Sequence, residues 1–331
     1  MDYNKEIDFS SLETFLDCPR KFMFRYVMNL VSTGPPSLDL VFGSCWHYGM
    51  ELAFKQLQTD PNTPPETLTD IAREAFNRLW EAEAGPWFDP DSCFPKNPGR
   101  AADMFYRFFD EKLDTIFSHG DEIIGVEQPF TVDLNLGQES ARYPAYIGKL
   151  DLIILKDQHS IEIIDHKTAK MVNDTTFNGF MQSMQTDGYL TAGHIYYDSL
   201  PVITYSVALC QKTKIDFSHL QISRRKAAID RFLDDLLVFT TDIRNNLTVY
   251  KEEVSMTEDK LYNPRSFRRK PGYVCTKYFR KCPYFDLCLG RNNPMQWAHE
   301  PPQGFEFDEW HPANIDPNTI LDQSQKEKSN V

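Results

Sequence analysis

The chain has 331 residues, of which 41% are hydrophobic and 13% aromatic, which is enough to build a proper core in one large or two modest domains. Its net charge of −13 argues against a protein that coats nucleic acid nonspecifically. No apolar run approaches the roughly 18 residues that span a bilayer, and the polar first residues do not resemble a signal peptide. We therefore expect a soluble, cytoplasmic protein with no membrane partner.

The first third of the chain is predicted to be helical. Residues 9–30 have apolar side chains at helical spacing, and Ser10 with Glu13 fits a capping box at the start. A second, short helix is expected over residues 44–58. Two longer helical segments follow between residues 60 and 120, separated by a stretch rich in Pro, Gly and Asn. We interpret residues 60–120 as a helical insertion.

The pattern then changes to strands and returns to helices. Strands are predicted over residues 123–134, 143–156, 161–170 and 202–210. Helices are predicted near residues 180–197 and over residues 218–245. This order indicates an α/β fold with a helical insertion.

One domain accounts for this order better than two domains do. We place it at residues 1–295, with a cysteine cluster at residues 273–290. After Pro294 the chain becomes polar and rich in proline, so residues 296–331 are predicted to be a disordered tail.

Two basic stretches interrupt the acidic background, SRRKAAIDR at 223–231 and RSFRRKPGYVCTKYFRKC at 265–282. The second is interleaved with aromatic residues. A basic groove on an acidic protein is common among enzymes that act on DNA. The alternative is that each stretch is simply a solvated face of the protein.

Charged residues follow a buried strand at IEIIDHKTAK. If residues 145–168 form a hairpin centred on Gln158, residues whose numbers sum to 316 face each other, and Asp151 lies opposite Asp165. Two opposed carboxylates beside a core need a shared proton or a cation. Mg²⁺ or Mn²⁺ would satisfy them, with Lys167 near a phosphate or an activated water. The hairpin alone does not distinguish this site from a salt-bridge ladder at a strand end.

The segments GKLDLI and IIDHKT resemble motifs II and III of the PD-(D/E)xK nuclease superfamily. More narrowly, the chain is similar to the RecB-like branch and to the iron–sulfur nucleases of CRISPR adaptation and their phage relatives. Three further segments stand in the order of that branch: SLETFLDCPRKFMFRY, GSCWHYGMELAF and QTDGYLTA. The resemblance covers roughly residues 9–290 without the insertion. It implies a restriction-endonuclease-like core, in which a mixed central sheet is flanked by helices.

The resemblance implies a metal site. His47, Asp151 and Asp165 would ligate Mg²⁺ or Mn²⁺, with the backbone carbonyl of His166 as a fourth contact. Lys167 would position or activate the attacking water. A core histidine is the alternative for His47 taken alone.

The resemblance also implies supporting roles for three other residues. Gln185 and Tyr189, four residues apart and so on one helix face, would hold the DNA strand or orient Lys167. Glu127 would be a carboxylate beside the metal or a ligand of a second metal. Plain packing is the alternative for Tyr189.

The seven cysteines, with no signal peptide, argue against a disulfide framework. Cys18 lies near the N-terminus, and Cys275, Cys282 and Cys288 cluster near the C-terminus. In the resembling nucleases one N-terminal and three C-terminal cysteines bind a [4Fe–4S] cluster, which here would fasten the two ends of the domain together.

The spacing of these cysteines departs from the family. A C-x-x-C pair often precedes the last cysteine, whereas here six residues separate Cys275 from Cys282. Zinc is the alternative, although structural zinc sites usually contain a pair two to four residues apart, which this cluster lacks. The remaining cysteines, Cys45, Cys93 and Cys210, are predicted to be ordinary buried or half-buried residues.

These features predict a Mg²⁺- or Mn²⁺-dependent deoxyribonuclease, most simply an exonuclease that acts on single-stranded DNA or DNA ends in repair or recombination. The chain has no G-x-x-x-x-G-K-[ST] phosphate loop, so any unwinding would come from a helicase partner. The resemblance also implies recombination or CRISPR-adaptation partners. The alternatives are a non-cleaving DNA-binding or assembly protein that retains the fold, and a restriction-type endonuclease.

Overall fold

The computed structural model describes residues 3, 6–135, 144–256, 264–290 and 293–309. The chain divides into two compact units. The cysteine unit comprises Met1–Gly34, Thr131–Gly148 and Arg231–Pro312, and the sheet unit comprises Pro35–Phe130, Lys149–Asp230 and Ala313–Val331. Within the described ranges, no helix is both long and apolar enough to cross a lipid bilayer.

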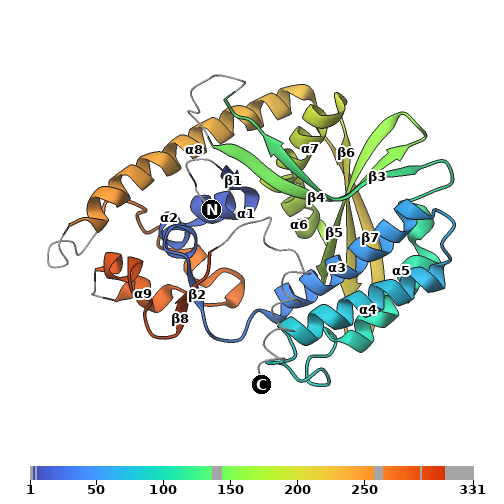
Figure 1. Ribbon diagram of the computed structural model, residues 1–331, viewed down its shortest axis with the longest axis horizontal. Coiled ribbons are helices and arrows are strands. Elements are labelled where there is room, and N and C mark those ends of the chain that lie inside the picture. Colours follow the sequence, from blue (N-terminus) through green and yellow to red (C-terminus); the bar gives the residue numbers. More distant parts are fainter. Residues whose placement is uncertain (1–2, 4–5, 136–143, 257–263, 291–292, 310–331) are drawn as a thin grey trace. The chain divides into compact units, whose positions relative to one another are not determined.

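A mixed sheet is the centre of the fold, as predicted (Figure 1). Its strands are β1 (Glu6–Asp8), β3 (Glu122–Val132), β4 (Ala145–Lys156), β5 (Ser160–Ala169), β6 (Val202–Cys210) and β7 (Ile215–Ser223). The order is β1-β4-β5-β6-β7, and β3 also pairs with β4. β5 and β6 are parallel, whereas β4 with β5 and β6 with β7 are antiparallel.

The register of the β4–β5 hairpin confirms the prediction. Leu152 pairs with Ile164 and Lys156 with Ser160, so the numbers of paired residues sum to 316. The turn residues Asp157 and Gln158 have φ values of 48° and 62°. Two consecutive residues in the left-handed region match the right-handed twist of the flanking strands, and this fixes which face each side chain takes.

Three helices cover one face of the sheet: α3 (Leu38–Thr59), α4 (Pro65–Glu83) and α5 (Pro98–Glu111). They lie together in Figure 1 and share a core with Leu152 and Ile164 of the hairpin. Trp46 stacks on Phe105 with ring centroids 4.3 Å apart. A Cβ on Gly49 would lie 2.5 Å from the Phe105 ring, so a glycine is needed where these helices approach closely.

The opposite face carries α6 (Asp174–Met181) and α7 (Met184–Tyr197). Phe180 at the end of α6 stacks on Tyr205 of β6, with centroids 4.3 Å apart and an interplanar angle of 6°. The hydroxyl of Thr186 in α7 lies 2.7 Å from that of Tyr205. Ile164 pairs with Thr204, the residue before Tyr205, so the Tyr205 side chain points to the opposite face from Ile164. These contacts therefore fall on the face away from α3.

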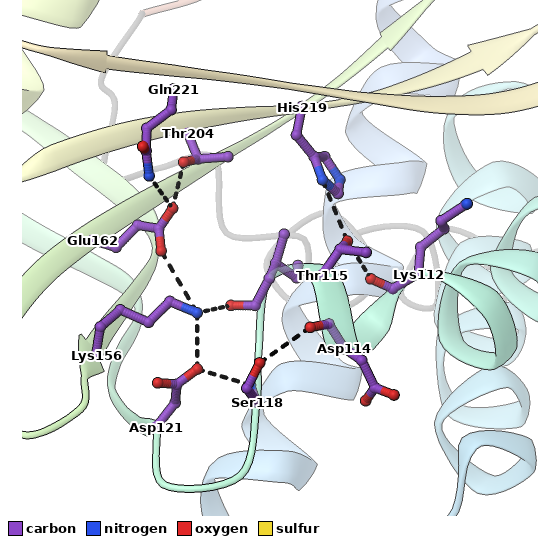
Figure 2. Close-up of polar contacts among 11 residues, drawn as sticks. Lys112, Asp114, Thr115, Ser118, Asp121, Lys156, Glu162, Thr204, His219 and Gln221 are labelled. Atoms are coloured by element: carbon purple, nitrogen blue, oxygen red, sulfur yellow. Dashed lines mark hydrogen bonds and ion pairs between the residues drawn. The ribbon is translucent and has the colours of Figure 1, made fainter.

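A polar network joins the segment after α5 to the edge of the sheet (Figure 2). That segment includes the short helix η2 (Leu113–Thr115). Lys156 Nζ donates to Asp121 Oδ2 at 2.8 Å and to the carbonyl of Ile116 at 2.7 Å, and it lies 3.6 Å from Glu162 Oε2. Glu162 in turn accepts a hydrogen bond from Thr204. The network compensates buried charge in the scaffold.

The cysteine unit is built from short elements around aromatic side chains. These are α1 (Phe9–Asp17), α2 (Pro19–Phe22), the π-helix η1 (Met23–Val27), β2 (Leu30–Ser32), η4 (Tyr273–Phe279), α9 (Phe285–Leu289), η5 (Pro294–Ala298) and β8 (Phe305–Phe307), together with most of α8 (Lys226–Val254). Phe22 stacks on Phe267 with centroids 5.6 Å apart. β2 and β8 pair as a separate two-stranded sheet. Residues 310–331 of the predicted tail lie outside the described residues.

Two predicted helices differ from the structure. The helix over 9–30 is interrupted at Cys18, which is extended (φ −158°, ψ 107°) because the next residue is proline. Its capping box uses Asp8 and Ser11 in place of Ser10 and Glu13. The first part of the predicted helix at 218–245 is instead strand β7, and the helix α8 runs to Val254.

Candidate active site

Three potential metal ligands from three elements meet in the sheet unit. They are His47 on α3, Glu127 on β3 and Asp151 on β4, and one ligand atom of each lies within 4.8 Å of the other two. His47 Nδ1 is 3.0 Å from Asp151 Oδ2. The same oxygen accepts a hydrogen bond of 3.0 Å from the backbone N–H of His166. The sheet backbone therefore fixes the position of the Asp151 carboxylate.

Asp165 and Lys167 lie together on one face of β5. Asp165 Oδ2 is 2.6 Å from Lys167 Nζ, and its side chain is only 1% exposed. Asp165 Oδ1 is buried without a hydrogen-bond partner among the described residues. Lys167 Nζ also lies 6.0 Å from the centre of the Tyr205 ring. Since β5 is a regular strand, the two functional groups stand on the same side of the sheet.

His166, between them, turns the other way. Its ring stacks on Phe54, with centroids 5.5 Å apart and an interplanar angle of 19°, and meets the edge of Phe108. Burial lowers the pKa of His166 to about 3, so the ring is neutral at physiological pH. The side chain packs in the helical core, and the backbone of His166 is the part that faces Asp151.

Glu127 joins the site through an irregular backbone. Its φ of 49° places a non-glycine residue in the left-handed region inside strand β3. Glu127 Oε2 is 2.5 Å from Lys149 Nζ on the neighbouring strand. Sequence reasoning missed Lys149 as the partner of this carboxylate. The alternation of GKLDLI places Lys149 and Asp151 on one face and is the signal that could have found it.

The electrostatics of the site follow from crowding of buried charges. Burial, and next the charge of Asp151, raise the pKa of Glu127 to about 7. Burial also raises the pKa of Asp165 to about 6, against the opposing effect of Lys167. Burial disfavours charge on His47 and Lys167 too, but the neighbouring carboxylates outweigh it and raise both pKa values. His47 and Lys167 conversely overcome burial at Asp151, whose pKa falls below its usual range.

The sequence model of the PD-(D/E)XK nuclease superfamily matches residues 7–289 of the chain. The chain belongs to this superfamily. Membership implies a metal-dependent nuclease, and enzymes of the superfamily typically use Mg²⁺ or Mn²⁺. The solved structure titled "Crystal structure of SSO0001" is 14% identical over 71% of this chain and 76% of that chain, with a TM-score of 0.29. No curated protein matches the chain.

In this PD-(D/E)XK nuclease, Gln185 and Tyr189 form a pair on α7. Gln185 Nε2 donates to Tyr189 Oη at 2.9 Å, and the Tyr189 ring meets the edge of Phe130 at the end of β3. The two side chains therefore share one helix face, as their spacing predicts. Their roles toward a substrate or toward Lys167 stay predictions.

The four cysteines singled out in the nuclease sequence line one pocket in the cysteine unit. Cys18 separates α1 from α2, Cys275 lies in η4, and Cys288 lies in α9. The backbone N–H of Cys282 donates to the carbonyl of Cys275 at 2.9 Å. The cations Arg20, Lys21, Arg269 and Lys270 also line this pocket.

The other three cysteines lie elsewhere, as predicted. Cys45 and Cys210 are buried and Cys93 is half-buried. Cys45 packs in the core shared by α3, α4 and α5. Burial raises the pKa of the Cys45 thiol, which favours the inert protonated form.

Proposed function

We propose that the protein is a Mg²⁺- or Mn²⁺-dependent deoxyribonuclease of the RecB-like branch, and that it acts as an exonuclease on single-stranded DNA or DNA ends. The observation that carries the proposal is the convergence of His47, Glu127 and Asp151 at the strands that present Asp165 and Lys167. Any helicase, recombination or CRISPR-adaptation partner, and a cytoplasmic location, belong to the same proposal.

The residues present fit a divalent cation. Carboxylate oxygens are suitable donors for Mg²⁺ or Mn²⁺, and the single imidazole fits the softer Mn²⁺ better than Mg²⁺. Asp165 Oδ1 is a buried oxygen whose hydrogen-bonding capacity is unused among the described residues. His47, Asp151, Asp165 and the carbonyl of His166 would hold the ion, with Glu127 beside them. When bound, such an ion neutralises phosphate charge and lowers the pKa of a bound water.

Lys167 supplies the positive charge that the chain itself brings to the reaction. Asp165 holds its ammonium group, and the ring of Tyr205 limits where that group can move. A protonated lysine in this position can contact a phosphate oxygen and orient a water molecule toward phosphorus. Gln185 and Tyr189 would support the DNA strand beside it.

We also propose that Cys18, Cys275, Cys282 and Cys288 bind a [4Fe–4S] cluster. All four line one pocket, which is the arrangement that a four-thiolate centre requires. A single zinc ion, about 2.3 Å from each sulfur, is the alternative occupant of this pocket.

The proposal is tested with protein purified without oxygen and incubated with end-labelled single-stranded DNA and Mn²⁺ or Mg²⁺. We expect metal-dependent cutting that Asp165→Ala abolishes. Asp70→Ala, at an exposed carboxylate on α4 paired with Arg73, is the matched control and should cut normally. The product ladder gives the polarity of an exonuclease.

Closed circular DNA separates the proposed exonuclease from an endonuclease. Cleavage of the circles would show that the enzyme does not need a DNA end, and the proposed metal site would still stand. No cutting of any substrate by folded, metal-supplied wild-type protein would overturn the nuclease and favour a non-cleaving DNA-binding protein.

A further inference from the structure

A buried arginine in the cysteine pocket has an unused hydrogen-bond donor. Arg20 in α2 is only 4% exposed. Among the described residues its Nη2 atom has no hydrogen-bond partner, and Arg20 forms no ion pair with a carboxylate there. A buried charge that lacks an opposite charge is costly, so a native fold that retains one has a partner for it.

A hydrogen bond from Nε holds this guanidinium in place. Arg20 Nε donates to the carbonyl of Phe267 at 2.8 Å. Phe267 is fully buried, has a φ of 43° and receives its own support from Asn246, whose Oδ1 accepts the Phe267 N–H at 2.7 Å. A constrained carbonyl and a stacked ring therefore hold Arg20 in one position.

The cysteine pocket offers the partner that this donor lacks. Arg20 lines the same pocket as Cys18, Cys275, Cys282 and Cys288. Four thiolates bound to a metal there would supply negative charge beside the buried guanidinium.

We propose that Arg20 donates a hydrogen bond through Nη2 to a sulfur of the metal centre held by the four cysteines and neutralises part of its negative charge. This inference rests on the proposed cysteine-bound centre, and it gives Arg20 a positioning role that the superfamily match does not assign. Four thiolates outweigh the charge of the metal they bind, so the centre needs a nearby cation. Hydrogen bonds to the sulfurs and the net charge around them also set the reduction potential of such a cluster.

The test compares Arg20→Gln and Arg20→Lys with the wild-type chain, all purified without oxygen. Lys251→Gln is the matched control because Lys251 on α8 is an exposed cation of the same unit and lies outside the residues that line the pocket. Iron, sulfide and zinc are counted per chain first. The reduction potential is then measured by redox titration of the visible absorbance, and the rate of metal release is measured with a strong chelator.

We expect Arg20→Gln to have a more negative reduction potential and a several-fold faster release of metal. Arg20→Lys should lie between Arg20→Gln and the wild type, and Lys251→Gln should stay near the wild type. Equal potential and equal release rate for Arg20→Gln and the wild type, at equal metal content, would overturn the inference. If Arg20→Gln fails to assemble, wild-type behaviour of Arg20→Lys would equally overturn the hydrogen bond from Nη2.

The metal content per chain distinguishes a failure of this inference from a failure of the proposed iron–sulfur cluster. Zinc in place of iron would refute the iron–sulfur cluster, and the release rates would still test Arg20 against a four-thiolate zinc centre. A wild-type chain that binds neither metal would overturn the cysteine centre and the role of Arg20 together. None of these outcomes tests the nuclease assignment, which the cleavage assay of Asp165→Ala tests.

Discussion

The acidic site of the sheet unit and the cysteine pocket differ in what holds them together. Asp151, Asp165 and Lys167 project from strands whose backbone hydrogen bonds already fix their positions. The pocket residues lie on short helices, namely α2 with four residues, η4 with seven and α9 with five. Such short helices are weak on their own.

The comparison predicts how each site would depend on a bound metal. The acidic site is preorganised by the scaffold, so a metal should bind it without creating its structure. The pocket has few regular hydrogen bonds around it, and a bound centre would therefore supply part of its folding free energy. Loss of metal should cost the first site its activity and the second site its fold.

The largest effect is expected from removal of the charge of Lys167. Lys167→Met should lower the cleavage rate by about 10²- to 10⁴-fold, the usual contribution of a positioned acid–base group. Lys170→Met, at a lysine 66% exposed on the same segment, should change the rate little. Single-turnover cleavage with saturating Mn²⁺ measures both. A loss of less than threefold in Lys167→Met would remove Lys167 from the reaction.

Loss of one pocket cysteine should act on stability. Cys282→Ser should release the metal and lower the free energy of unfolding by about 4 kcal/mol, in the range seen when a structural metal is lost. Cys93→Ser, at a half-buried cysteine outside the pocket, should retain the metal. Limited proteolysis reports where the chain opens. Cleavage confined to the sheet unit in Cys282→Ser would contradict the comparison.

A smaller effect concerns pH and the metal-free acidic site. Because the pKa values of Glu127 and Asp165 are raised to about 7 and about 6, the folded protein retains protons that the unfolded chain releases near pH 4 to 4.5. Stability of the metal-free protein should therefore fall as pH rises from about 5 to about 8. His47 contributes in the same direction, since its raised pKa gives stability at low pH that is lost as pH rises. His166 acts in the opposite direction, because burial lowers its pKa to about 3, but the two carboxyl groups and His47 together outweigh it.

Thermal unfolding at about pH 5.5 and about pH 8, with and without Mn²⁺, measures this effect. We expect a difference of about 1–3 kcal/mol without metal, at about 1.4 kcal/mol per unit of pKa shift. Mn²⁺ competes with the same protons, so its stabilising effect should increase with pH. Glu127→Gln should reduce the pH dependence. An unchanged pH profile in that variant would show that Glu127 does not titrate in this range.

The smallest effect is expected at the polar network of Figure 2. Lys156→Met leaves Asp121 and Glu162 without their shared cation and should cost about 1–2 kcal/mol. Cleavage should remain normal, because the strands still carry the acidic site. Chemical denaturation and the DNA assay measure the two results. A large loss of activity with little loss of stability would mean that the site is less rigid than the sheet suggests.

The sequence predicts the arrangement of Asp165 and Lys167 on their strand well because strands have a simple period. Alternation of side chains and a turn centred on Gln158 sufficed to place Asp165 and Lys167 on one face and to give the β4–β5 register. Strand β7 was missed because its alternation runs directly into the basic start of α8. The backbone conformation of Glu127 and the contacts of Arg20 mark the other limit. A positive φ inside a strand and a buried donor held by a carbonyl 247 residues away leave no local pattern.

The distance along the chain between the pocket cysteines has a consequence for biosynthesis. Cys18 and Cys288 are 270 residues apart (288 − 18), which at about 5–20 residues per second is about 14–54 s of translation. The hairpin that carries Asp165 and Lys167 is complete long before that. Throughout the interval Cys18 and Arg20 must wait for the rest of their pocket, so it is the last site to close and the one most exposed to oxidation while the chain is made.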